Sequence, residues 1–122
     1  MLATAPVIET VVDCLADYPG PIVVDPVMVA ATGDRLLSED AEDAYNDLIT
    51  RSTLVTPNVD EAEILTGMGI DDAADAERAA RQLVDNGADA ALVKGGHLDG
   101  EAVVDTLVIG TGGDSRTERF SH

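Results

Sequence analysis

The sequence has few aromatic residues, few basic residues and one cysteine. It contains no tryptophan, and aromatic side chains make up 2% of its 122 residues, so alanine, valine, leucine and isoleucine must form the core. Cys14 is the only cysteine, so the chain can form no intramolecular disulfide. One cysteine and two histidines, spaced as they are in this sequence, cannot build a zinc site. This cysteine usage fits a reducing compartment, and we expect a cytoplasmic protein.

The chain also has no long apolar run and no basic leader. It contains no stretch of about 18 apolar residues, so we expect no membrane span. Its first residues, Met1-Leu-Ala-Thr-Ala-Pro6, lack the basic region of a signal peptide. These observations predict a protein that neither crosses nor enters a membrane.

Basic residues are outnumbered by acidic ones throughout the chain. There are 7 lysines and arginines against 24 aspartates and glutamates, which gives a formal charge of −17. Such a chain is unsuited to nucleic acid or to anionic lipid, because both require basic surface. Acidic pairs such as Asp71-Asp72 could hold a metal. Because the acids are spread over the whole chain, we favour a solvated, salt-adapted (halophilic) surface.

Hydrophobic periodicity predicts one α/β domain over residues 1–122. Helices are expected from Thr4 to 15, after Ser38 to 49, and over 59–66 and 73–85. Tyr45 belongs to the buried stripe expected of the second helix. Short apolar runs at 22–24, 53–56 and 90–93 predict buried strands, and 103–109 with 115–120 predict a C-terminal β-hairpin. Strands that alternate with helices imply a mostly parallel sheet.

Polar residues follow each of the three buried strands. They occupy 25–28, 56–61 and 94–97. Open α/β sheets bind ligands beyond the carboxyl ends of their strands, so these three segments are the candidate site. By contrast, Thr111-Gly-Gly-Asp114 resembles a phosphate loop, but no helix follows it, and we interpret it as a hairpin turn.

The segment Lys94-Gly95-Gly96-His97 is the most specific of these signals. Lys94 is the only lysine in the chain. An ammonium group there can neutralise phosphate oxygens, and adjacent glycines let backbone N–H groups approach an anion. The alternative is an ordinary exit from a strand with a solvated lysine, and His97 is as well explained by a loop hydrogen bond as by catalysis.

Two carboxylates in the other segments have both structural and functional interpretations. In the structural interpretation, Asn58 followed by Glu61 forms a capping box. In the functional one, Glu61 lies beside a phosphate at a helix N-terminus, and Mg²⁺ must lie between the two negative groups. Asp25 precedes a proline, and it starts a turn, holds Mg²⁺ through water, or orients a substrate hydroxyl.

Together these residues resemble the hydroxymethylpyrimidine/phosphomethylpyrimidine kinase family of thiamine biosynthesis, within the ribokinase superfamily. The resemblance implies a partial ribokinase-like three-layer fold and covers essentially the whole chain. Pyridoxal kinases are close relatives of this family. The matching segments are Met1–Thr4, Pro21–Met28, Gly33–Ser38, Thr56–Glu63 and Val93–His97, with Asp105 and Leu107 in the hairpin.

The resemblance implies phosphoryl transfer from ATP, with Mg²⁺, to a small-molecule pyrimidine and then to its monophosphate. Carried over, Lys94, Gly95, Asn58 and Glu61 are the nucleotide-binding residues. Glu61 and Asp25 are the metal ligands, and Asp25 with Val27 contacts the substrate.

The resemblance also implies that the catalytic Gly-Thr-Gly-Cys segment of the family lies beyond His122, and Cys14 does not replace it. We therefore expect no catalytic residue in this chain and an inactive fragment of the kinase. Two alternatives are a non-catalytic nucleotide-binding or assembly module, and a fragment of a pyridoxal kinase-like enzyme. A homo-oligomer is compatible with each of them.

Overall fold

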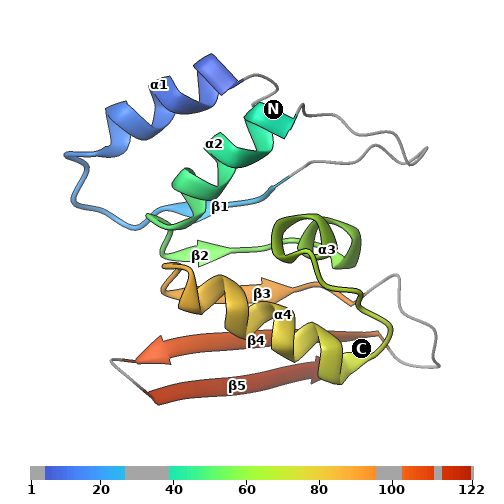
Figure 1. Ribbon diagram of the computed structural model, residues 1–122. Helices are drawn as coiled ribbons and strands as arrows, with labels where there is room; N and C mark the ends of the chain where they lie inside the picture. Colours follow the sequence, from blue (N-terminus) through green and yellow to red (C-terminus); the bar gives the residue numbers. More distant parts are fainter. Residues whose placement is uncertain (1–4, 27–38, 96–102, 112–113, 122) are drawn as a thin grey trace.

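The computed structural model describes residues 5–26, 39–95, 103–111 and 114–121. The elements follow the predicted order of helix, strand, helix, strand, two helices, strand and hairpin (Figure 1). Their bounds are α1 Ala5–Leu15, β1 Val23–Val24, α2 Glu39–Ile49, β2 Leu54–Val55, α3 Val59–Thr66, α4 Ala73–Asp85, β3 Ala90–Val93, β4 Val104–Thr111 and β5 Asp114–Ser121.

The five strands form one mixed sheet in the order β1-β2-β3-β4-β5. β1, β2 and β3 run parallel, with Val24 opposite Val55 and Val55 opposite Ala91. β4 and β5 then pair antiparallel, so the predicted hairpin extends the parallel part of the sheet. The parallel arrangement places the carboxyl ends of the first three strands along a single margin of the sheet.

The hairpin is longer than the sequence predicts. β4 continues to Thr111 and β5 begins at Asp114, whereas the sequence predicted a turn from Gly110 to Asp114. Gly110 belongs to β4, and its N–H donates to the carbonyl of Asp89 at 2.8 Å. This tertiary hydrogen bond extends strand pairing into a segment whose composition is typical of turns.

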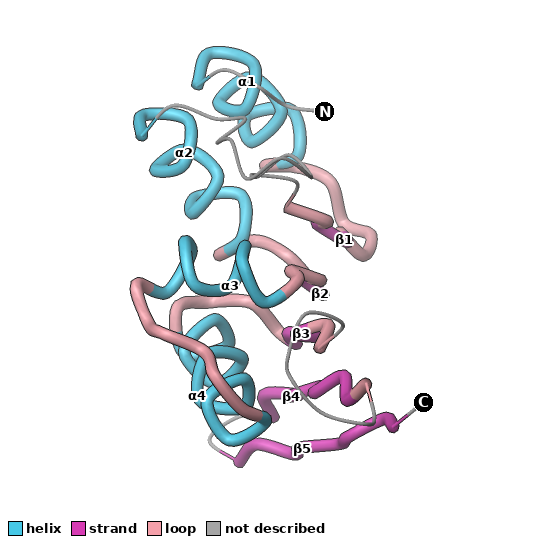
Figure 2. Tube along the Cα trace, turned by 90° about the vertical axis from the view of Figure 1, so that its right-hand side faces the viewer, coloured by secondary structure: helices cyan, strands magenta, loops and turns pink. Residues whose placement is uncertain are grey.

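Helices cover one face of the sheet. In Figure 2, α2, α3 and α4 lie on the same side of the strands, and α1 packs beside α2. Ile49 and Leu83 from this layer are buried with Val55, Ala91 and Val108 from the strands. The described residues therefore supply the sheet and one helical layer of the expected three-layer fold. In this part of the chain no helix is long and apolar enough to cross a bilayer.

The ends of α3 are set by local sequence. Asn58 is its N-cap, and Gly67 closes it in the left-handed conformation with φ of 71°. A residue with a Cβ is strained there, which is why the helix stops at this glycine. As a result, α3 starts immediately after β2, with its N-terminus beside the carboxyl ends of the strands.

Candidate functional site

The candidate site forms where β1, β2 and β3 end. Asp25 follows β1, Thr56 follows β2 and Lys94 follows β3. Lys94 Nζ lies 3.5 Å from Asp25 Oδ1, and Thr56 Oγ1 donates to the same oxygen at 3.4 Å. Three segments separated by 31 and 38 residues in the sequence thus place polar groups at one point.

Backbone pairing holds this arrangement beyond the strands themselves. The N–H of Lys94 donates to the carbonyl of Pro57 at 2.9 Å, and Asn58 forms a parallel bridge with Lys94. Lys94 is therefore fixed at its main chain next to the start of α3. Only its flexible side chain remains free to reach a ligand.

The ion pair between Lys94 and Asp25 is weak. The two side chains are 43% and 59% exposed, so water screens their attraction, and exposed pairs of this kind contribute about 0–1 kcal/mol. The ammonium group can therefore exchange Asp25 for a more strongly charged anion without a large loss of stability. A phosphate group is such an anion.

Asn58 and Glu61 form the predicted capping box. Glu61 N–H donates to Asn58 Oδ1 at 2.8 Å, and Asn58 N–H donates to Glu61 Oε1 at 2.9 Å. The Glu61 residue is buried, with 4% of its surface exposed. Among the described residues, nothing donates a hydrogen bond to its Oε2. The cap thus uses one carboxylate oxygen of Glu61, and contact of the other with a metal-bound water or a cation stays a prediction.

Tyr45 belongs to this site although the sequence indicated only a core role for it. It lies in α2, is buried, and its hydroxyl donates to the backbone carbonyl of Asp25 at 3.4 Å. Burial raises its pKa above the usual value, and the negative charges of Asp25 and Glu61 raise it further. Both carboxylates therefore act on one hydroxyl. One sequence signal could have identified Tyr45 as a site residue. It is a tyrosine expected to be buried in a chain with few aromatics, and buried tyrosine hydroxyls usually form a hydrogen bond.

Gly95 has a structural role that the sequence did not indicate. Its N–H donates to Asp105 Oδ1 at 2.8 Å. A Cβ at this position would lie 1.9 Å from the carbonyl oxygen of Val104. The glycine therefore allows β4 to approach closely, and its amide is already engaged by a carboxylate. Contact between this amide and a nucleotide phosphate stays a prediction, and it requires Asp105 to release the N–H.

The predicted metal ligands Asp25 and Glu61 lie within the described residues, but three other predicted positions do not. Val27, Gly96 and His97 lie outside the described residues. Within the described part of the chain, no three acidic, histidine or cysteine side chains cluster closely enough to hold a metal. Asp25 and Glu61 alone still suit Mg²⁺, which commonly binds one or two carboxylates and completes its shell with water and substrate phosphates.

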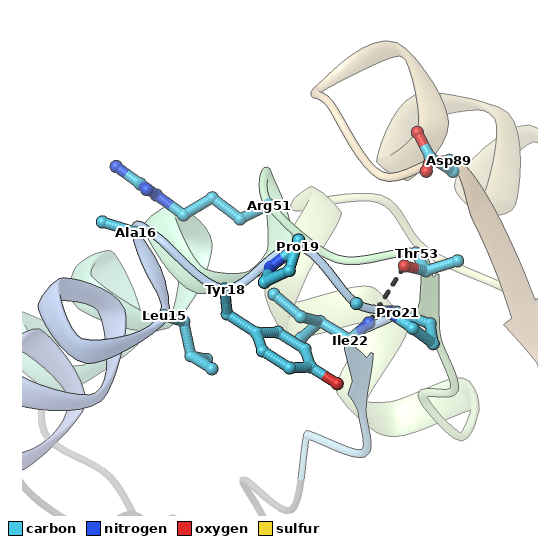
Figure 3. Close-up of a pocket in the computed structure, with 10 residues that line it drawn as sticks. Leu15, Ala16, Tyr18, Pro19, Pro21, Ile22, Arg51, Thr53 and Asp89 are labelled. Atoms are coloured by element: carbon cyan, nitrogen blue, oxygen red, sulfur yellow. Dashed lines mark hydrogen bonds between the residues drawn. The ribbon is translucent and has the colours of Figure 1, made fainter.

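A cavity of about 200 Å³ lies beside Asp25 and Tyr45, where it is walled by apolar side chains including Val11, Val24 and Leu48. A larger hollow of about 520 Å³ lies at the opposite margin of the sheet, before the strands begin, and is shown in Figure 3. Ile22 and Thr53 line this larger hollow and are joined by a hydrogen bond. Ligands bind at the carboxyl ends of parallel strands, so the candidate site lies at the margin that holds Asp25, and of its residues Asp25 and Tyr45 line the smaller cavity.

Comparisons with known proteins show the family to which the chain belongs. The sequence matches the phosphomethylpyrimidine kinase family over residues 1–121. It is 46% identical over 104 residues to a hydroxymethylpyrimidine/phosphomethylpyrimidine kinase of Streptomyces coelicolor, covering 84% of this chain and 39% of that protein. The chain thus spans about two fifths of the length of this curated relative.

Solved structures show the same fold. A phosphomethylpyrimidine kinase from Clostridium difficile superposes with a TM-score of 0.84 at 36% identity, over 96% of this chain and 50% of that one. An ADP complex of Bacillus subtilis pyridoxal kinase gives a TM-score of 0.84 at 28% identity, over all of this chain and 44% of that one. The architecture is a partial ribokinase-like fold, and the chain belongs to the phosphomethylpyrimidine kinase family.

Proposed function

We propose that this chain supplies the phosphate-binding end of an ATP-dependent kinase that phosphorylates hydroxymethylpyrimidine and then its monophosphate in thiamine biosynthesis. The observation that carries the proposal is the position of Lys94. The single lysine of the chain lies at the carboxyl end of β3, 3.5 Å from Asp25 and next to the N-terminus of α3.

The electrostatics of this position suit a polyphosphate. Lys94 supplies a compact positive charge, and the N-terminus of α3 supplies the positive end of a helix dipole. In a chain of charge −17, the net field repels a polyphosphate over most of the surface. We therefore expect a polyphosphate to bind where the Lys94 ammonium group lies beside the N-terminus of α3.

The acidic residues of the site need a cation between themselves and the nucleotide. Asp25 and Glu61 would hold Mg²⁺, partly through water, with the remaining ligands supplied by ATP phosphates. When bound, Mg²⁺ offsets the negative charge that develops on the transferring phosphoryl group. The residues of this chain bind and orient the phosphates, and the family resemblance assigns Asp25 and Val27 to contact with the substrate.

The pyrimidine substrate is assigned from the relatives that match along the sequence. The S. coelicolor protein is a hydroxymethylpyrimidine/phosphomethylpyrimidine kinase. Pyridoxal is a second candidate, because the B. subtilis pyridoxal kinase shares the fold to the same TM-score as the C. difficile enzyme. We favour the pyrimidine because the sequence identity to its kinases is higher. We place the reaction in the cytoplasm.

The whole reaction is tested with an assay of ADP release, at high salt, on hydroxymethylpyrimidine, its monophosphate and pyridoxal. Since the chain spans two fifths of its relative, we expect ATP binding but no turnover from these 122 residues alone. A chimera that joins them to the flanking parts of the C. difficile kinase should turn over both pyrimidines. Turnover of pyridoxal alone would contradict the proposal. A chimera whose rate of ADP release is unchanged by Lys94→Ala would also contradict it.

A further inference from the structure

The outer edge of β5 is an open strand edge. β5 pairs along its whole length with β4, and it has no second strand neighbour among the described residues. Figure 1 shows it at the lower margin of the sheet, away from β1 and the candidate site. An eight-residue edge presents a row of unpaired backbone groups that can accept another strand.

The charge of β5 differs from that of the rest of the chain. Two acidic residues, Asp114 and Glu118, are balanced by Arg116 and Arg119. The strand is therefore neutral in a chain of charge −17. Two copies of this chain repel each other over most of their surface, and the β5 edge is a place where they can approach without that cost.

Contacts on both faces hold β5 in place before any partner arrives. On the helical face, Arg81 of α4 donates to Thr117 Oγ1 at 3.0 Å and also to Ser115 Oγ. On the opposite face, Arg116 Nη2 lies 2.7 Å from Glu118 Oε1, and Arg116 Nε donates to the same oxygen. Among the described residues, nothing donates to Glu118 Oε2. A preformed edge loses little conformational entropy on pairing.

The order of charges in β5 and the length of the strand together select one register for pairing with a second copy. In an antiparallel pair, each residue lies directly opposite one residue of the other strand. When the two strands are copies related by a twofold axis, one residue at the axis lies opposite its own copy, and the pairing is centred on that residue. Centring on Thr117 places Arg116 opposite the partner's Glu118, twice. Centring on Arg116 opposes two arginines, and centring on Glu118 opposes two glutamates. Centring on Ser115 also opposes Arg116 and the partner's Asp114, but it pairs only residues 114–116 of the strand, whereas centring on Thr117 pairs residues 114–120.

We propose that two copies of this chain pair antiparallel through their β5 edges, about a twofold axis at Thr117. The two sheets then join into one, with Arg116 of each copy facing the partner's Glu118. Pairing through one strand buries less than the roughly 1,600 Å² of a standard interface, so the dimer is weak and concentration-dependent. The like charges opposed in neighbouring registers disfavour those registers.

The test is sedimentation velocity at one fixed salt concentration, over a series of protein concentrations. The wild type should shift from monomer to dimer. Arg116→Glu and Glu118→Arg should each weaken the dimer by about tenfold, because each opposes like charges twice. The double variant Arg116→Glu/Glu118→Arg restores the complementary pattern and should restore dimerisation. The two single variants change net charge in opposite directions, so an effect of net charge alone would weaken the dimer in one variant and strengthen it in the other.

Hydrogen exchange on the wild type gives a second reading that needs no variant. The amides of β5 that point outward should exchange more slowly at high than at low protein concentration. A wild type that stays monomeric, a folded double variant that fails to dimerise, or β5 exchange that is independent of concentration would each overturn the proposal.

Discussion

Replacing Gly95 by alanine should destabilise the protein far more than the same change at Gly69. The added Cβ at Gly95 would lie 1.9 Å from the carbonyl oxygen of Val104, a main-chain atom. β3 and β4 would have to separate by about 1 Å, and overpacking of this kind costs about 1–3 kcal/mol. The shift would also weaken the hydrogen bond from Gly95 N–H to Asp105, which measures 2.8 Å.

Together these effects predict a loss of about 2–4 kcal/mol in the free energy of unfolding, or roughly 10 °C in melting temperature for a domain of this size. Gly69 is the matched control, because a Cβ there has no neighbour within 4 Å and its φ is not positive. Urea unfolding of both variants is the assay. If Gly95→Ala were as stable as Gly69→Ala and instead lost ATP affinity, the structural role of Gly95 would be refuted.

Three further predictions concern the helix cap, Tyr45 and the surface charge. Asn58→Ala should lower the free energy of unfolding by about 1 kcal/mol in urea, whereas Asn58→Asp should retain most of it, since only the aspartate can still accept from Glu61 N–H. Burial and two carboxylates raise the pKa of Tyr45, so its contribution to stability is complete below about pH 10 and is lost as the pH rises through the folded pKa. Unfolding curves for Tyr45→Phe should lack this alkaline loss, and a Tyr18→Phe variant, which leaves Tyr45 as the only tyrosine, should show tyrosinate absorbance rising above pH 10. Finally, the melting temperature should rise from dilute buffer to molar KCl, because salt screens the repulsion within a chain of charge −17, and a melting temperature indifferent to salt would contradict a salt-adapted surface.

Local sequence signals predicted the elements and the margin of the sheet where the candidate residues meet. Apolar runs ended by Asp25, Thr56 and Lys94 were sufficient to expect three strand ends at one margin, because parallel strands end together. The capping box was equally local, since Asn58 and Glu61 contact each other across a single turn. Patterns of this kind depend on neighbours in the sequence, so periodicity and spacing reveal them.

Periodicity and spacing could not predict contacts between residues that lie far apart in the sequence. Tyr45 meets Asp25 across 20 residues, and Gly95 meets Asp105 across 10. The sequence marked Tyr45 as core and Gly95 as a phosphate ligand, because residue type alone does not tell which partner a side chain or amide will find. The extent of the hairpin depended in the same way on a hydrogen bond between Gly110 and Asp89.

The most direct test of the account is isothermal titration of ATP with Mg²⁺ into the chain and into variants at the two ends of the sheet. We predict that Lys94→Ala weakens binding by about tenfold or more, because it removes a charge-assisted contact to phosphate. Lys94→Arg should recover only part of the affinity. Arg51→Ala, in the larger hollow at the opposite margin, should leave it unchanged. Equal affinities for wild type and Lys94→Ala, or a loss at Arg51→Ala instead, would contradict the assignment of the nucleotide site.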